Sequence, residues 1–180
     1  MSAVTESEAA GTSGAQAVRR RVLAARVGLV IVAAIQAEVG VWGLIAPRSL
    51  FNDFPGAGRH WISALGPYNE HLVRDYAGAE LGLAVLLLMA AVWFERRLVL
   101  AAGIVFLAAT IPHFIYHLST TGSFSTGDDL ASLGGFVVEM VLVGIAMSVA
   151  ARAPREADRD PPDARRDPPD AGRDPRGAEQ

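Results

Sequence analysis

The chain has no cysteine among its 180 residues. It can therefore form no disulfide, hold no iron–sulfur cluster on thiolates and use no thiolate for catalysis or for thiol-based quinone chemistry. It also lacks lysine, since all sixteen basic residues are arginine, which we interpret as a sign of a GC-rich genome rather than of function. The formal net charge of -3 is too small to indicate nucleic-acid binding.

Hydrophobic residues make up 51% of the chain and gather in long runs with polar ends. A helix needs about 20 mostly apolar residues to cross a bilayer. Four runs reach that length, over residues 22–46, 71–94, 98–118 and 130–151. The sequence therefore predicts an all-α integral membrane protein, a four-helix bundle in the lipid bilayer formed by residues 19–152.

The arginines next to these four runs fall on one side of the membrane if the chain crosses four times. They are Arg19, Arg20, Arg21, Arg26, Arg96, Arg97, Arg152 and Arg155. The connections on the other side have few arginines: residues 124–129 have none, and residues 47–70 have Arg48 and Arg59. The positive-inside rule then predicts a multi-pass protein of a bacterial plasma membrane with both termini cytoplasmic. A twin-arginine export signal is the alternative interpretation of Arg19 to Arg21, and the three further spans disfavour it.

Both ends of the chain differ in composition from the bundle. Residues 1–18 are small and polar and are predicted to be disordered. Residues 153–180 repeat Arg-Asp-Pro-Pro-Asp-Ala at 159–164 and at 166–171. Proline removes helix donors and the charges leave nothing apolar to bury, so this segment is predicted to be an extended, solvated tail. It is either a tether for a cytosolic partner or a low-complexity extension without a role, the latter being favoured.

Ionisable residues inside the predicted spans are the strongest functional signal, because such groups are rarely kept in hydrocarbon without a partner or a task. His113 and His117 are four residues apart on a predicted helix and face the same way. Nearly all intramembrane charges fall in the outer half or at the midplane. The sequence thus predicts an outward-facing polar pocket lined by Glu38, His71, Arg74, Asp75, Glu80, His113, Tyr116, His117 and Glu139.

Three further patterns concern packing around this pocket. Steps of four, three and four join Asp128, Ser132, Gly135 and Glu139 into one predicted polar stripe on the fourth helix. Gly78 and Gly82 have the small-xxx-small spacing that lets a neighbouring helix approach, either in the same chain or in a partner or second copy. The aromatic connection 48–70 is predicted to be a short interfacial helix or lid, or else a loop resting in the headgroup region.

Three functional hypotheses fit these residues. In the first, His113 and His117 ligate a metal or haem, with Asp75, Glu80, Glu38 or His71 completing the shell, although histidines at this depth often only form hydrogen bonds.

In the second hypothesis, Glu80 or Asp75 acts as a general acid on a lipid-like or isoprenoid substrate in a pocket lined by Trp42, Phe114 and Tyr116. The third is a small accessory subunit or binding protein, with an apolar small molecule as one ligand, whose buried charges pair to fix helix packing, for example Arg74 with Asp75, Glu70 or Asp128. The third hypothesis leads, and a membrane-embedded enzyme is the alternative.

Two sequence stretches carry a resemblance to known membrane proteins. Gly43 to Pro47, together with Ala77 to Leu83, resembles the small four-helix DoxX-like proteins. Pro67 to Asp75, followed by Pro112 to His117, is similar to uncharacterised actinobacterial membrane proteins, and the resemblance spans residues 28–150. It implies a four-helix membrane fold. DoxX-like relatives are associated with quinone or thiosulfate oxidation complexes, which we do not transfer to a chain without cysteine or a settled redox ligand set.

Overall fold

A computed structural model describes the backbone of residues 2–152 and the side chains of residues 14–152. The fold of this part is all-α, with the elements α1 (Ser2–Ile45), α2 (Pro47–Asp53), the 3-10 turn η1 (Ser63–Leu65), α3 (Glu70–Trp93), α4 (Arg96–Ser119) and α5 (Thr126–Ala151). Four segments are long and apolar enough to cross a membrane: Gly14–Ile45, Glu70–Trp93, Arg96–Ser119 and Thr126–Ala151. This confirms the four predicted spans. The predicted tail, residues 153–180, lies outside the described residues.

The helices begin and end where local chemistry requires. Asn69 caps α3 by accepting a hydrogen bond from the backbone N–H of Leu72 at 3.2 Å, and Ser125 caps α5 in the same way from Asp128. Pro47 is the first residue of α2, a position that needs no backbone donor. The helical backbone of α1 begins well before the predicted residue 22, since helix-forming alanines and arginines precede it and no proline interrupts them. The side chains of residues 1–13, most of the segment predicted to be disordered, lie outside the described residues.

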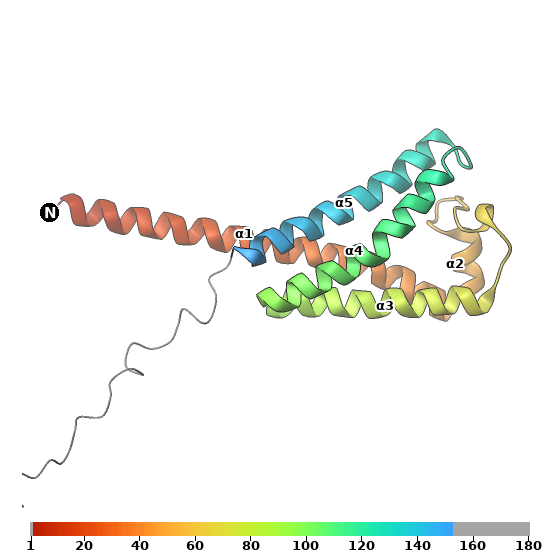
Figure 1. Ribbon diagram of the computed structural model, residues 1–180, viewed down its shortest axis with the longest axis horizontal. Coiled ribbons are helices and arrows are strands. Elements are labelled where there is room, and N and C mark those ends of the chain that lie inside the picture. Colours follow the sequence, from red (N-terminus) through yellow and green to blue (C-terminus); the bar gives the residue numbers. More distant parts are fainter. Residues whose placement is uncertain (1, 153–180) are drawn as a thin grey trace, which may run out of the picture.

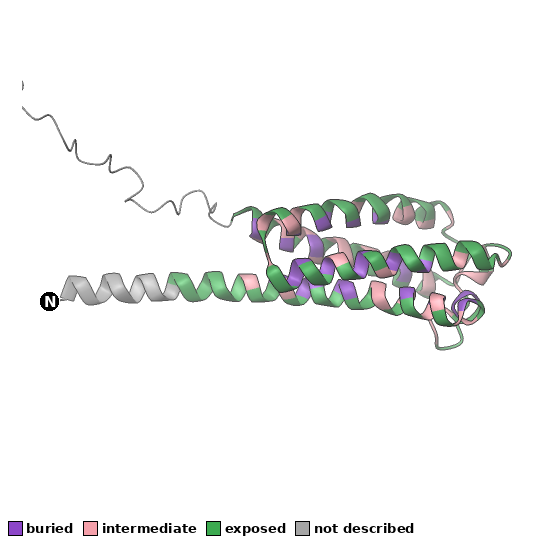
Figure 2. Ribbon diagram, turned by 90° about the horizontal axis from the view of Figure 1, so that it is seen from below, coloured by how far each residue is buried: buried purple, intermediate pink, exposed green. Residues whose placement is uncertain are grey.

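The four long helices form a ring in which α1 contacts α3, α3 contacts α4, α4 contacts α5 and α5 contacts α1. In Figure 1 α4 and α5 diverge from α3 toward the end of the bundle where α2 lies, which we call the α2 end. Phe106, Leu29 and Leu87 are fully buried between the helices, and the buried residues in Figure 2 follow the inward sides of the helices. The core is thus apolar and lies along the axis of the bundle.

The outer surface of the bundle is also apolar. Ile45, Leu130 and Ile104 are 78%, 68% and 61% exposed, and valines and leucines on every long helix accompany them. Such a surface is unfavourable in water and matches hydrocarbon. The chain is therefore a multi-pass membrane protein whose helices contact the lipid bilayer.

The closest helix contact, between α1 and α3, depends on two glycines of α1. A Cβ atom on Gly40 would lie 2.7 Å from the backbone nitrogen of Leu81, and one on Gly43 would lie 2.5 Å from the Cβ of Ala77. The prediction that Gly78 and Gly82 mediate packing within the chain is wrong, because a Cβ on either would meet nothing within 4 Å. The small residues that matter here are on the facing helix, since Gly78 and Gly82 lie on the exposed side of α3.

Candidate functional site

Polar side chains from all four long helices are buried or partly buried between them, and we call them the polar cluster: Gln36 of α1, Tyr76 and Glu80 of α3, His113 and His117 of α4, and Ser132 and Glu139 of α5. Tyr76 is the most exposed of them, at 38%. Glu80 is 9% exposed. Its carboxylate accepts a hydrogen bond of 2.9 Å from the side-chain amide of Gln36. This bond joins α1 to α3 beside the close contact made by Gly40.

The histidine pair joins α4 to α5. The Nε2 atoms of His113 and His117 are 3.2 Å apart, as their spacing of four residues on one helix allows. The other ring nitrogen of His117, Nδ1, is 3.2 Å from the hydroxyl oxygen of Ser132, which is buried. The tautomer of each imidazole decides which nitrogen donates in these contacts.

Aromatic rings enclose the pair on two sides. The ring of His113 packs edge-on against Tyr76 of α3, with centroids 6.1 Å apart, and against Phe136 of α5, at 4.9 Å. Phe136 also lies 5.2 Å from His117. The predicted stripe on α5 is therefore wrong at Gly135, which is exposed with open space around it. The inward face runs Ser132, Phe136, Glu139, because steps of four and three keep side chains on one side of a helix.

Two carboxyl groups belong to the cluster. Glu80 on α3 is buried and Glu139 on α5 is half-buried. Carboxyl and imidazole groups of α3, α4 and α5 are thus withdrawn from the outer surface of the bundle. Four of the nine predicted pocket residues come together here, namely Glu80, His113, His117 and Glu139.

Three other predicted pocket residues lie at the surface of the first turns of α3. The Nε2 atom of His71 lies 3.3 Å from the carboxyl group of Asp75, and the two side chains are 87% and 62% exposed. Arg74 pairs with Glu70 at 2.9 Å, one of the partners proposed for it from the sequence, and donates to the carbonyl of Leu44 at 2.7 Å. The bond to Leu44 fastens the start of α3 to the end of α1, and the other two contacts are between exposed residues of α3 itself.

The remaining two predicted pocket residues are also exposed. Glu38 lies on the outer side of α1, two residues beyond the inward-facing Gln36. Tyr116 is 48% exposed and touches the histidine pair only through the edge of its ring, 6.0 Å from that of His117.

Gln36 and Phe136 were not predicted from the sequence as neighbours of the site. Gln36 could have been predicted, because it is the one amide side chain in residues 22–46 and polar residues are rare in such runs. Phe136 could not, since one more phenylalanine in an apolar run does not indicate which way its side chain points.

The connection between α1 and α3 covers the α2 end of the bundle. Leu50 and Phe51 of α2 are buried. Beyond α2 the chain reaches α5, where Arg59 and Asp128 form an ion pair of 2.7 Å, and Trp61 packs near Phe124 at 6.4 Å. The structure thus has a short helix, as one of the two predicted alternatives expected, followed by a loop that contacts α5.

Metal-ligating side chains are sparse around the histidine pair. Among residues 14–152, no three side chains of histidine, aspartate or glutamate come together in a group that could hold a metal ion. His71, Asp75 and Glu38, which the sequence analysis considered as further ligands, do not join His113 and His117 in such a group.

Comparison with models of protein families, with curated proteins and with solved structures found no match to this chain. The resemblance to DoxX-like proteins therefore has no support from these comparisons, and the function has to be argued from the polar cluster itself.

Proposed function

We propose that the protein is a small membrane-embedded binding or accessory subunit in which the polar cluster holds the four helices together. One observation carries this proposal: the polar groups are engaged with one another across helices. Gln36 and Glu80 link α1 to α3 at 2.9 Å, and His117 and Ser132 link α4 to α5 at 3.2 Å. Interhelical hydrogen bonds of this kind stabilise bundles in lipid, where water does not compete.

An accessory role also needs a surface for a partner. Gly78 and Gly82 lie on the exposed side of α3 with no atom within reach of an added Cβ. Small residues four apart allow another helix to approach closely. We assign contact with a partner membrane protein, or with a second copy of this chain, to this side of α3.

The cluster is tested by two substitutions at Glu80. Glu80→Gln is expected to keep nearly all stability, because an amide oxygen still accepts the hydrogen bond from Gln36. Glu80→Leu leaves that amide without its partner and is expected to cost about 1–2 kcal/mol. The measurement is unfolding of the purified full-length protein in detergent micelles. Glu38→Leu, at an exposed position of the same region, is the control and should not destabilise the protein.

The opposite order of stabilities among these variants would contradict a packing role for Glu80. A Glu80→Leu protein more stable than the wild type would mean that the carboxyl is retained at a cost to stability, as expected at a substrate site.

A membrane-embedded enzyme is the second candidate, favoured by the convergence of Glu80, His113 and Glu139 from three helices. In that case the carboxyls exchange protons with a lipid-like or isoprenoid substrate, or the two imidazoles ligate a metal or haem. An enzyme of this kind is expected to tolerate Glu80→Leu in folding, so the same stability measurement separates it from the packing protein.

We propose further that the membrane is the bacterial plasma membrane and that both termini are cytoplasmic, because the arginines flanking the spans share one end of the bundle. An alkaline phosphatase reporter fused after Gly122, in the connection between α4 and α5, is expected to be active. A fusion after Arg97, in the first turn of α4, is the control and should be inactive. Activity in the reverse pattern would invert the topology.

A further inference from the structure

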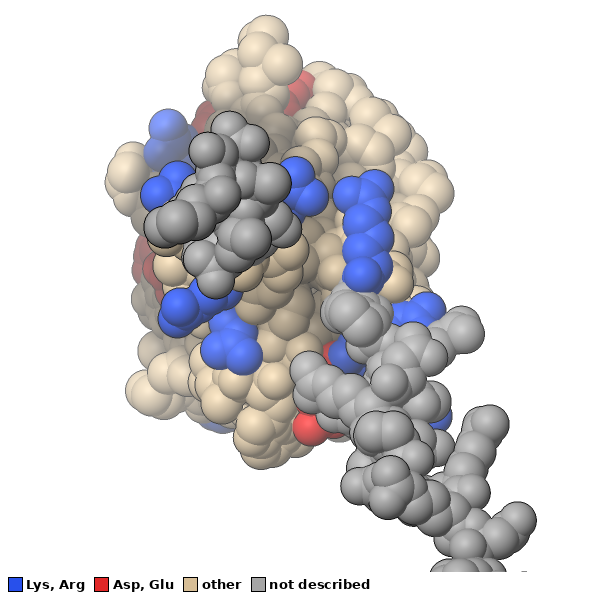
Figure 3. Space-filling view, turned by 90° about the vertical axis from the view of Figure 1, so that its left-hand side faces the viewer, with Lys and Arg blue, Asp and Glu red and all other residues tan. Residues whose placement is uncertain are grey.

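Positive charge is concentrated at the end of the bundle opposite α2. Seven arginines belong to the segments at this arginine end: Arg19, Arg20, Arg21, Arg26, Arg96, Arg97 and Arg152. Figure 3, which views the molecule from this side, shows basic side chains in blue around it. In the described segments that form it, residues 14–30, 92–100 and 145–152, the one acidic residue is Glu95. The ion pairs of the described residues involve none of these seven arginines. The arginine end therefore has a large excess of positive charge.

Two of these arginines hold donors that lack an acceptor. The Nε atoms of Arg26 and Arg96 are buried and have no hydrogen-bond partner in the described part of the chain. The guanidinium of Arg26 is held over the ring of Phe94, with its Cζ 5.6 Å from the ring centroid, and Arg96 follows two residues later. An unsatisfied buried donor costs free energy, so these N–H groups call for an acceptor that the described residues do not supply.

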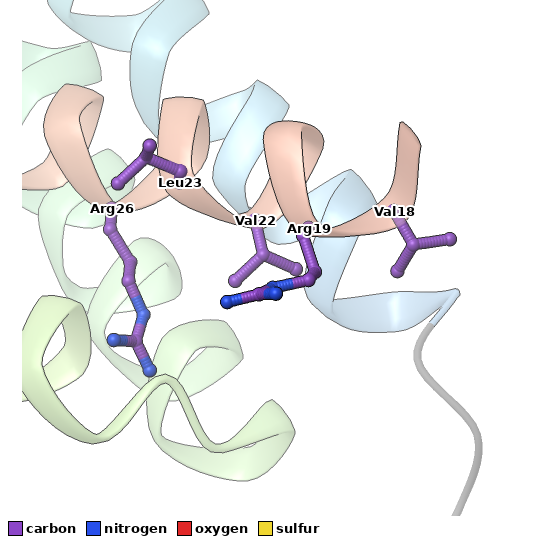
Figure 4. A pocket seen from close by; sticks show the side chains of 5 residues that line it. All are labelled: Val18, Arg19, Val22, Leu23 and Arg26. Atoms are coloured by element: carbon purple, nitrogen blue, oxygen red, sulfur yellow. The ribbon is translucent and has the colours of Figure 1, made fainter. Parts of the chain in front are cut away.

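A hollow in the surface lies beside Arg26. Its lining residues, shown in Figure 4, are Val18, Arg19, Val22, Leu23 and Arg26. A second hollow adjoins it and is lined by Gln16, Arg19, Arg20 and Leu23. Both combine guanidinium groups with apolar side chains of one helix, which runs on into the bilayer.

We propose that this end binds an anionic phospholipid, with its phosphate at Arg26 and Arg96 and an acyl chain along the side of α1 that continues from Arg26 toward the bilayer centre, where Val30, one turn further, is 44% exposed. Guanidinium forks match phosphate oxygens with paired hydrogen bonds. A lipid fits better than a soluble phosphate, because apolar side chains of α1 that follow Arg26 toward the bilayer centre, such as Val27 and Val30, are exposed and could contact an acyl chain. Basic pockets at the ends of transmembrane helices recognise anionic headgroups by the same chemistry.

The experiment measures lipid binding to the purified full-length protein by native mass spectrometry in detergent. Titration with phosphatidylglycerol is expected to give a saturable adduct, and phosphatidylcholine a much weaker one. The double variant Arg26→Gln, Arg96→Gln is expected to weaken phosphatidylglycerol binding about thirtyfold. The matched control Arg97→Gln, Arg152→Gln removes the same charge from the same end without touching the two buried donors, and should weaken it less than about threefold.

Three results would overturn the proposal. An equal loss of phosphatidylglycerol binding in both double variants would mean that the lipid is attracted to the overall positive charge and not to a specific site. Displacement of the lipid by millimolar inorganic phosphate would identify a site for a soluble anion. Binding that appears only after deletion of residues 153–180 would mean that the acidic side chains of that segment are the natural occupants.

Should the double variant not fold, Arg26→Lys, Arg96→Lys keeps the charge and is expected to bind more weakly than the wild type, because lysine lacks the planar fork. Unchanged binding in that variant would also count against the proposal.

Discussion

Replacement of Gly40 by alanine is expected to destabilise the bundle by about 3 kcal/mol. The added Cβ would lie 2.7 Å from the backbone nitrogen of Leu81 and 2.9 Å from the carbonyl oxygen of Ala77. These are backbone atoms of α3, so no rotamer change relieves the overlap and the two helices have to separate. Separation also lengthens the nearby hydrogen bond between Gln36 and Glu80, at 2.9 Å in the native bundle. Equilibrium unfolding in detergent micelles measures the loss.

Gly78→Ala is the matched control for this prediction. It places the same methyl group on the exposed side of α3, where a Cβ meets nothing within 4 Å. Alanine is the better helix former, so this variant is expected to be as stable as the wild type or slightly more stable, by up to about 1 kcal/mol. Equal destabilisation by the two substitutions would contradict the assignment of the helix contact to α1 glycines.

Truncation of Phe106 to alanine is expected to have the largest effect on stability, a loss of about 3–5 kcal/mol. Phe106 is fully buried and is the largest such side chain in the described core. Its removal leaves a cavity, because the neighbouring helices are held apart by their other contacts and cannot collapse fully. The loss consists mainly of packing contacts, which are what the interior of a membrane bundle gains over lipid.

Ile104, two residues away on α4, provides the comparison. It is 61% exposed on the lipid-facing side. Ile104→Ala replaces one apolar side chain in contact with lipid by a smaller one. The expected loss of stability is therefore less than about 1 kcal/mol. The free energies of unfolding of both variants are measured in the same detergent. A similar loss of stability at the two positions would mean that α4 is rotated about its axis relative to the structure described above.

Span positions were predictable from sequence because they depend on local properties. Length, apolar content and flanking arginines set the four segments to within a few residues, and a cap such as Asn69 marks the start of α3 through its own side chain. The start of α1 was not predictable in this way, since the change in polarity near residue 22 marks where the helix becomes apolar and not where it begins.

Contacts between helices depend on rotation, which a single sequence specifies poorly. Gln36 and Glu80 are 44 residues apart, and nothing local indicates that their helices turn these two side chains toward each other. The sequence likewise does not indicate that Gly40, and not Gly78, lies at the contact of α1 with α3. Within one helix the spacing rule suffices, as the 3.2 Å approach of His113 and His117 shows.

Depth in the membrane was a poor guide to which polar residues meet. His71, Arg74 and Asp75 share a level at the start of α3, yet they are turned outward and pair among their own neighbours. Glu139 lies farther along its own helix but is half-buried. Angular position around each helix, at about 100° per residue, decides membership of the cluster.

The ion pair between Arg59 and Asp128 gives the bundle a mechanical asymmetry. At the arginine end α3 and α4 are joined by a turn of two residues, Phe94 and Glu95. At the α2 end the pair of helices α4 and α5 is held to the connection between α1 and α3 by this 2.7 Å contact. Ion pairs this exposed contribute about 0–1 kcal/mol and weaken in salt. This contact between α5 and the connection of α1 with α3 is therefore expected to weaken as the salt concentration rises.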